Sequence, residues 1–344
     1  MPNEKPRSAA RQWLWVVLSY GIAAGCLYWV FHGIPLRSLL HSFEGVEWEW
    51  IAPAVGLDLA VYFLAGWEWQ LLLRSVGRLR LVQTIQAIFA GRFANDLLPV
   101  HVGYVIRLYL ASRWTNRSVA SVVPSLLVER FFDSLWLALG IGLTVLFFPL
   151  PARFVRTGEG LGVGIVLGVL AVTGIVLRRK NRADGSCRPI LGRWKVSRKI
   201  GEFVGKVADG MRGIGRPDMV LAAAGISVLK LIAFVLAFLM LVWAYGFQFS
   251  VRTFLAVFVV AYTGLSIPST PASVGVFQLF CVAGLRFFGV SRSEAGSFAL
   301  LAFVVLNAPL SVGGFVALAQ SGLSWRQIRQ RLRSSHDLRP RADS

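Results

Sequence analysis

Long apolar runs separated by basic segments constrain this chain more than any other feature. Six runs have the length and character of membrane spans: residues 13–31, 50–73, 119–150, 162–177, 219–245 and 295–320. An apolar run of about twenty residues predicts a helix that crosses the bilayer. With a mean hydropathy of +0.62 and only 15% charged residues, the chain lies outside the range of soluble proteins. The predicted fold class is an all-α polytopic membrane protein, with one membrane domain over residues 1–344.

The net charge of +19 predicts orientation rather than nucleic-acid binding. The basic residues gather between the apolar runs and in the tail, which is the positive-inside pattern of membrane proteins. Residues 178–216 hold twelve Lys or Arg against three acidic residues, and apolar residues recur there at helical spacing. We therefore expect a basic cytoplasmic tail at 323–344 and a basic cytoplasmic loop at 178–217 with an amphipathic helix on the inner leaflet, the alternative being a simply packed cytoplasmic helix. Both termini are predicted to be cytoplasmic.

Two apolar segments are interrupted where a lipid-facing helix should be continuous. Residues 91–113 contain Pro99-x-x-Val102-Gly103, and residues 266–278 contain Pro271-x-x-Val274-Gly275. Proline removes a backbone donor and glycine leaves the backbone free to bend, so both segments should break. Broken backbone at membrane depth is tolerated only where protein or a water-filled cavity surrounds it. The two breaks therefore predict re-entrant helical hairpins at a central site.

The flanking charges place these two hairpins on opposite sides of the membrane. If the basic ends of the neighbouring spans are cytoplasmic, the first hairpin enters from the inside and the second from the outside. Residues 50–150 then form one half of an inverted repeat and residues 219–321 the other, a common transporter plan. The expectation is about six full spans plus two re-entrant hairpins. The alternative is eight to ten full spans, in which the half-hairpins cross completely.

Three charges within one span are the strongest functional signal. Glu129, Arg130 and Asp133 lie roughly 15 to 20 Å along a helix that begins near Val119, close to the bilayer midplane. Charges at that depth are costly and should face protein or water in pairs. The trio is either part of a site or an ion cluster that holds spans together. Lys230 is also deep in its span and needs a partner, for which the carboxylates are candidates.

The hairpins supply the other candidate binding residues. Half-helices that start at Gly103 and Gly275 would direct unpaired N–H groups towards the hairpin tips, where they favour an anion such as lipid phosphate. Arg107 would add positive charge, and the polar residues near the breaks either bind substrate or cap helix ends. The predicted substrate-binding set is Asn95, Pro99, Gly103, Arg107, Glu129, Arg130, Asp133, Pro268, Pro271, Gly275 and Gln278. Neither the three cysteines nor the four histidines have metal-ligand spacing, no nucleotide-binding loop is present, and no cofactor is expected.

These motifs resemble a known family. Residues 91–133 contain, in order, Asn95, Leu98-Pro99, Gly103, Arg107 and Glu129-Arg130-x-x-Asp133, a set similar to the transmembrane region of lysylphosphatidylglycerol synthases and of free-standing flippase-like proteins. Residues 268–277 resemble the second Pro- and Gly-rich motif of that family. The chain departs from the pattern at three positions, His101, Tyr104 and Gln278, where the family has charged residues. These departures put the identity of the substrate in doubt.

The resemblance implies movement of a lipid between leaflets. Relatives that synthesise lysyl lipid carry a soluble aminoacyltransferase domain after the membrane part, whereas a short basic tail follows Leu323 here, so no enzyme activity is expected. The expected function is a flippase in a bacterial cytoplasmic membrane for a polar or anionic lipid of the aminoacyl-phospholipid, polyprenyl-linked or hopanoid type. The alternative is a non-transporting accessory subunit of a membrane lipid or glycan biosynthetic enzyme. The expected partners are membrane lipids with an anionic head group, and the oligomeric state is left open.

Overall fold

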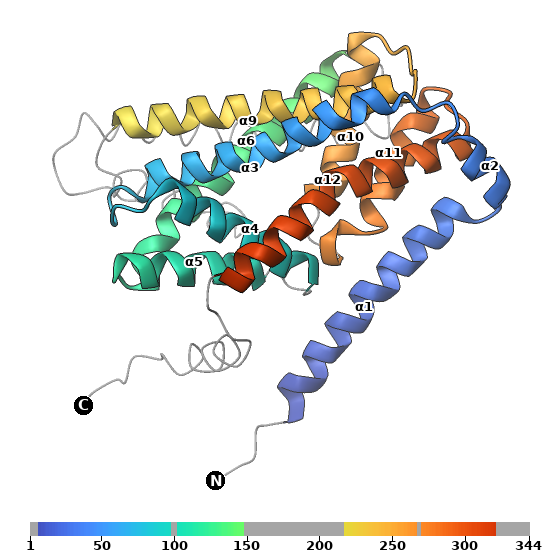
Figure 1. The fold of residues 1–344 in the computed structure, drawn as a ribbon. Helices are drawn as coiled ribbons and strands as arrows, with labels where there is room; N and C mark the ends of the chain where they lie inside the picture. The colour runs from blue at the N-terminus through green and yellow to red at the C-terminus, as the bar shows by residue number, and fades with distance from the viewer. Residues whose placement is uncertain (1–5, 98–101, 148–216, 267–269, 321–344) are drawn as a thin grey trace, which may run out of the picture.

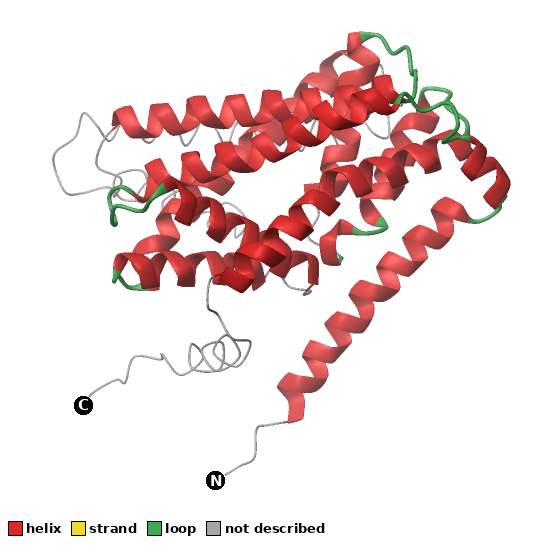
Figure 2. Ribbon diagram, in the orientation of Figure 1, coloured by secondary structure: helices red, strands yellow, loops and turns green. Residues whose placement is uncertain are grey.

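The computed structural model describes residues 6–97, 102–147, 217–266 and 270–320, and every regular element within these ranges is a helix (Figures 1 and 2). The elements are α1 (Pro6–Phe31), α2 (Leu36–His41), η1 (Trp48–Trp50), α3 (Ile51–Leu73), α4 (Leu81–Leu97), α5 (Val102–Thr115), α6 (Val119–Phe147), α9 (Pro217–Ala244), α10 (Val251–Ser266), η2 (Pro271–Ser273), α11 (Val276–Phe287) and α12 (Arg292–Gln320). The predicted span at 162–177, the basic loop at 178–217 apart from its last residue, and the tail at 323–344 lie outside the described residues.

The described helices have the composition of a membrane protein. Within these ranges, three are long and apolar enough to cross a bilayer: Trp48–Leu73, Asp218–Ala244 and Arg292–Gln320. Large apolar side chains on the outer face of α9 remain exposed, among them Leu221, Leu229, Ile232 and Trp243. Such a surface is stable only when lipid covers it. The predicted class, an all-α membrane protein, is confirmed, while the number of full spans stays a prediction.

Both interrupted segments form pairs of short helices. α4 packs against α5 and α10 against α11, with 17, 14, 16 and 12 residues respectively. At 1.5 Å per residue these helices are about 18 to 26 Å long, less than the roughly 30 Å of a hydrocarbon core. Their lengths favour re-entrant hairpins over complete crossings. The outer ends of the two pairs lie on opposite sides of the molecule, and the inner ends approach each other (Figure 1).

The two halves interlock through their hairpins. α3 packs along α9, and each hairpin contacts a long helix of the opposite half, α4 against α12 and α10 against α6. The tip of the second hairpin, η2, also contacts α4. One apolar core surrounds α10 to α12, with Phe238, Phe277 and Phe298 buried at its centre, and a second core joins α3, α4 and α5 to α12. These contacts hold the inner ends of the hairpins in the middle of the bundle.

Glycines allow the first hairpin to close tightly. A Cβ atom on Gly103 would lie 1.8 Å from the carbonyl oxygen of Gly91, far inside any contact distance. Only glycine therefore permits α4 and α5 to cross at this point. The sequence predicted a half-helix that starts at Gly103, and α5 begins one residue earlier, at Val102. Gly103 also allows the close packing of α4 against α5.

The N-terminal end of helix α1 lies away from the rest of the helix bundle (Figure 1). Its later part is attached to the second half. Gly275, with φ +82°, lies so close to α1 that a Cβ atom would be 2.6 Å from the carbonyl oxygen of Ala23. Arg292 donates a hydrogen bond to the carbonyl oxygen of Trp29 and lies over its ring. The second hairpin thus holds α1 at Ala23, and the start of α12 holds it near its C-terminal end.

Candidate functional site

A cavity of about 950 Å³ lies where the inner ends of the two hairpins meet. α1, α3, α6, α9 and α12 complete its walls. Its polar lining comes from both hairpins and from the long helices: Asp58, Arg92, Asn95, Asp96, Tyr104, Arg107, Glu129, Arg130, Asp133, Lys230, Thr270, Ser273 and Asn307. Polar groups at this density are unusual in the interior of a membrane protein and mark a functional site.

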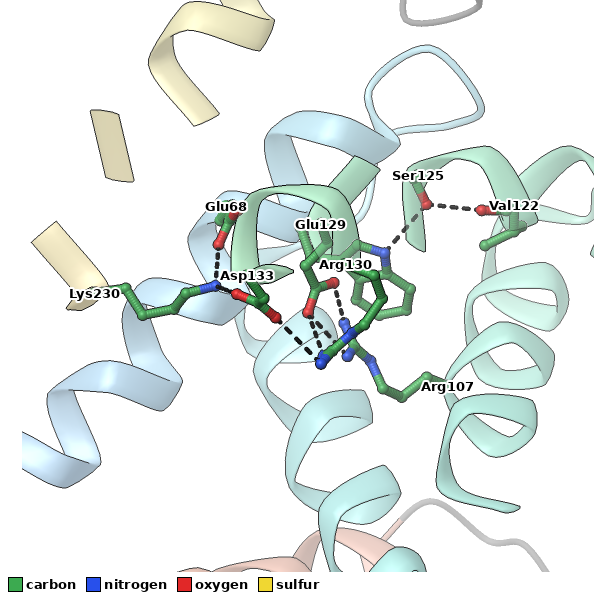
Figure 3. A network of polar contacts seen from close by, with 9 residues as sticks. Glu68, Arg107, Val122, Ser125, Glu129, Arg130, Asp133 and Lys230 are labelled. Atoms are coloured by element: carbon green, nitrogen blue, oxygen red, sulfur yellow. Dashed lines mark hydrogen bonds and ion pairs between the residues drawn. The ribbon is translucent and has the colours of Figure 1, made fainter. Parts of the chain in front are cut away.

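A continuous chain of ion pairs joins four helices along one side of the cavity (Figure 3). Lys230 Nζ on α9 donates to Glu68 Oε2 on α3 and to Asp133 Oδ1 on α6, both at 2.7 Å. The other oxygen of Asp133 lies 3.1 Å from Arg130 Nη1. Arg130 also contacts Glu129 at 3.1 Å, and Glu129 receives two hydrogen bonds from Arg107 on α5, at 3.1 and 2.6 Å. Glu129, Arg130 and Asp133 can all take part because residues three and four apart share one side of a helix.

Exposure divides this chain of ion pairs into two buried ends and a middle part that faces the cavity. The side chains of Arg107 and Glu129 are only 5% and 2% exposed, and Glu68 is fully buried. Arg130 is 39% exposed and Asp133 is 22% exposed. A charged ligand in the cavity would therefore meet Arg130 first, while the bidentate pair of Arg107 and Glu129 holds α5 to α6.

Aromatic rings support both arginines. The guanidinium of Arg107 lies 4.4 Å from the centre of the Trp69 ring, and that of Arg130 lies 4.8 Å from the centre of the Tyr104 ring. Cations over aromatic faces are stabilised by the ring quadrupole. Trp69 is itself fixed, since its Nε1 donates to Ser125 Oγ at 3.1 Å. Tyr104, noted in the sequence only as a departure from the family pattern, thus positions the exposed arginine.

A second polar cluster lies near the end of α4. Arg92 Nε is 3.4 Å from Asp96 Oδ1, and Arg92 Nη2 donates to Asn307 Oδ1 at 2.8 Å. Ser311 donates to Asp96 Oδ2 at 3.3 Å. Because Asn307 and Ser311 belong to α12, this cluster ties the first hairpin to the second half of the chain.

Side chains cap both half-helices. The N–H of Gly103 donates to Asn95 Oδ1 at 2.7 Å, and the N–H of Gly275 donates to Gln278 Oε1 at 2.7 Å. This is the capping role that the sequence left open for the polar residues near the breaks. A capped donor is already satisfied and gains little from an anion. Among the basic side chains in the chain of ion pairs, Arg130 is the most accessible source of positive charge for a ligand.

The structure brings together part of the predicted set. Five predicted residues line the cavity, namely Asn95, Arg107, Glu129, Arg130 and Asp133. Four others lie behind it and shape the hairpins: Gly103, Pro271, Gly275 and Gln278. Pro99 and Pro268 are outside the described residues. The charged and amide residues missing from that set are Asp58, Glu68, Arg92, Asp96, Lys230 and Asn307, whose sequence signal is a polar side chain in or beside an apolar run. Among the described residues, no group of three or more His, Cys, Asp or Glu side chains is placed to hold a metal ion.

Comparison with known families agrees with this architecture. The family described as "Lysylphosphatidylglycerol synthase TM region" matches residues 16–314. The chain belongs to this family. The match spans both hairpins, the chain of ion pairs and the cavity, so these features belong to the family region. Membership in the lysylphosphatidylglycerol synthase transmembrane family links the protein to membrane lipids. A search of curated proteins finds no match.

Proposed function

We propose that this protein moves a polar lipid between the leaflets of the membrane and is not itself an enzyme. The observation that carries the proposal is the cavity at the meeting point of the two hairpins, with a charged lining in the interior of a membrane protein. In this mechanism the lipid head group occupies the cavity while its acyl or prenyl tails remain in the bilayer. The family relationship supports a lipid as cargo.

The size of the cavity fits a head group. Ligand sites are commonly about 300 to 1,000 Å³, and the cavity, at about 950 Å³, lies at the upper end of that range. The charged walls would replace part of the water that a head group loses when it leaves the membrane surface. They therefore lower the barrier that keeps polar lipids in one leaflet.

Arg130 is the side chain placed to meet a head-group phosphate. It faces the cavity, and its two acidic neighbours each have another basic partner, since Asp133 contacts Lys230 and Glu129 contacts Arg107. Arg130 can therefore reorient towards a phosphate without leaving a buried carboxylate alone. Arg107 has no such freedom, because it is almost fully buried and binds Glu129 through two hydrogen bonds.

Reconstitution in liposomes tests the proposal. Vesicles that contain fluorescent phosphatidylglycerol, phosphatidylethanolamine or a polyprenyl phosphate should exchange at least one of these lipids between leaflets faster with the protein than without it. Arg130→Gln should lower the rate roughly tenfold or more, because a hydrogen bond to a charged group contributes about 1.5–3 kcal/mol. Arg117→Gln, the same change at an exposed loop position, is the matched control.

One outcome would contradict transport itself, and another would contradict only the role of Arg130. Lipid exchange that is no faster than in protein-free vesicles, for all three lipid classes, would remove its basis. If a biosynthetic enzyme also copurified at fixed stoichiometry in mild detergent, the protein would instead be an accessory subunit. Equal rates for Arg130→Gln and Arg117→Gln would keep transport but remove Arg130 from the head-group site.

A further inference from the structure

The charges around the cavity do not balance. The described basic side chains in the cavity wall are Arg92, Arg107, Arg130 and Lys230. The carboxylates of the wall, together with the fully buried partner of Lys230, are Asp58, Glu68, Asp96, Glu129 and Asp133. Five carboxylates thus face four cations. One negative charge remains if every group is ionised.

Among these five carboxylates, Asp58 is the one that makes no ion pair with a basic side chain of the described residues. It is 1% exposed, and its Oδ2 has no hydrogen-bond partner among the described residues. Each of the other four carboxylates has a basic side chain within 3.4 Å. Asp58 nevertheless belongs to the wall of the cavity.

Among the described residues, two basic side chains of the cavity wall are engaged elsewhere, and two tyrosines lie on the same wall. Arg92 acts on Asp58 electrostatically, but its guanidinium contacts Asp96 and Asn307. Tyr62, one turn along α3, and Tyr262 of α10 also line the cavity. On α9, Lys230 is held by two other carboxylates, Glu68 and Asp133.

An unpaired charge inside a bilayer costs several kcal/mol, so a cation should accompany Asp58. A single carboxylate without a cage of further oxygen ligands suits a proton better than a metal ion, which takes six or more oxygens when it is Ca²⁺ or Mg²⁺. We propose that Asp58 is the proton-binding carboxylate that couples lipid movement to the proton gradient across the membrane. This inference rests on the proposed function.

The proton step is a simple acid–base exchange. On one side of the membrane a hydronium ion in the cavity gives a proton to Asp58: an O–H bond of hydronium breaks, water is left, and an O–H bond forms on the carboxyl group. The protonated cavity then holds four negative and four positive side chains. After the cavity opens to the other side, the O–H bond breaks and the proton returns to water. No oxidant or reductant takes part.

Infrared difference spectroscopy tests proton binding without transport. The full-length protein in lipid is moved from alkaline to acidic buffer, and the carbonyl band of a protonated carboxyl group is recorded. Wild-type protein should show a band that Asp58→Asn lacks and that Glu49→Gln, an exposed control, retains. The same band in Asp58→Asn would overturn the assignment. The wild-type band could also disappear when phosphatidylethanolamine, but not phosphatidylglycerol, is added. That result would show that the ammonium group of a lipid head group pairs with Asp58, and it would overturn the assignment of a proton.

Gradient-driven transport tests the coupling. With one proton per lipid, a gradient of one pH unit should enrich the transported fluorescent lipid about tenfold in one leaflet for the wild type. Asp58→Asn should distribute it equally with and without the gradient. A wild type that equilibrates lipid but ignores the gradient overturns the coupling alone. A wild type that moves no lipid overturns the proposed function as well, and the infrared band then shows whether Asp58 still binds a proton.

Discussion

Replacing Lys230 with methionine should strongly destabilise the protein. Lys230 is the single described cation in contact with Glu68, whose other oxygen is buried without a hydrogen bond, and it also contacts Asp133. Methionine keeps a similar volume but leaves Glu68 as an uncompensated buried charge. Breaking a buried ion pair in this way costs about 3–5 kcal/mol. We expect the free energy of unfolding of Lys230→Met to be lower than that of the wild type by this amount.

The loss should be partly reversible by a second substitution. In Lys230→Met/Glu68→Gln one positive and one negative charge disappear together, while Asp133 keeps Arg130 at 3.1 Å. The double variant should recover at least half of the lost free energy, because removing both members of a buried pair is far less costly than removing one. Leu229→Met, on the exposed face of the same helix, is the control and should change stability by less than about 0.5 kcal/mol.

Unfolding in mixed micelles of mild detergent and dodecyl sulfate, followed by tryptophan fluorescence, measures these free energies, since the chain has 12 tryptophans. A loss below about 1 kcal/mol for Lys230→Met, or a double variant less stable than the single one, would refute the reasoning. Either result would mean that Glu68 finds another partner or water when Lys230 is absent.

Two further substitutions test how the first hairpin is built. Gly103→Ala should destabilise the protein by about 2 kcal/mol or more, because its Cβ atom would collide with the backbone of Gly91. Gly56→Ala is the control: the space around Gly56 is open, so this variant should be neutral or slightly stabilising. Thermal unfolding in detergent compares the two variants. Trp69→Phe should cost about 1 kcal/mol through loss of the hydrogen bond to Ser125, and a double-mutant cycle with Ser125→Ala should show a coupling of similar size. Strictly additive losses would show that this bond does not contribute.

Local sequence patterns predicted most of the helices. The apolar runs gave helix bounds within a few residues, as in 50–73 for α3 and 219–245 for α9, because a membrane span needs a fixed length of apolar residues. The breaks at Pro99 and Pro271 separated the helices of each hairpin correctly, since α4 ends at Leu97 and α11 begins at Val276. Both signals are local, so they can be interpreted without knowledge of tertiary contacts.

The pairing of polar residues could not be predicted in the same way. Lys230 contacts Glu68, 162 residues earlier in the chain, and Arg92 contacts Asn307 in the opposite half. No spacing rule connects such distant positions, so the sequence indicated only that each needed a partner. The same limit applies to Gly103, because a close approach to Gly91 is visible only when α4 and α5 are packed together.

The attachment of α1 has a mechanical consequence. Its contact with Gly275 is at Ala23, whereas Leu18, Ser19 and Ile22 line the cavity. Seventeen residues separate Ala23 from Pro6, a lever of about 25 Å. A tilt of a few degrees about that pivot would displace the far end by one to two ångströms. The cavity could thus open sideways towards the surrounding lipid through a rigid-body motion of α1 that leaves every backbone hydrogen bond of this helix intact.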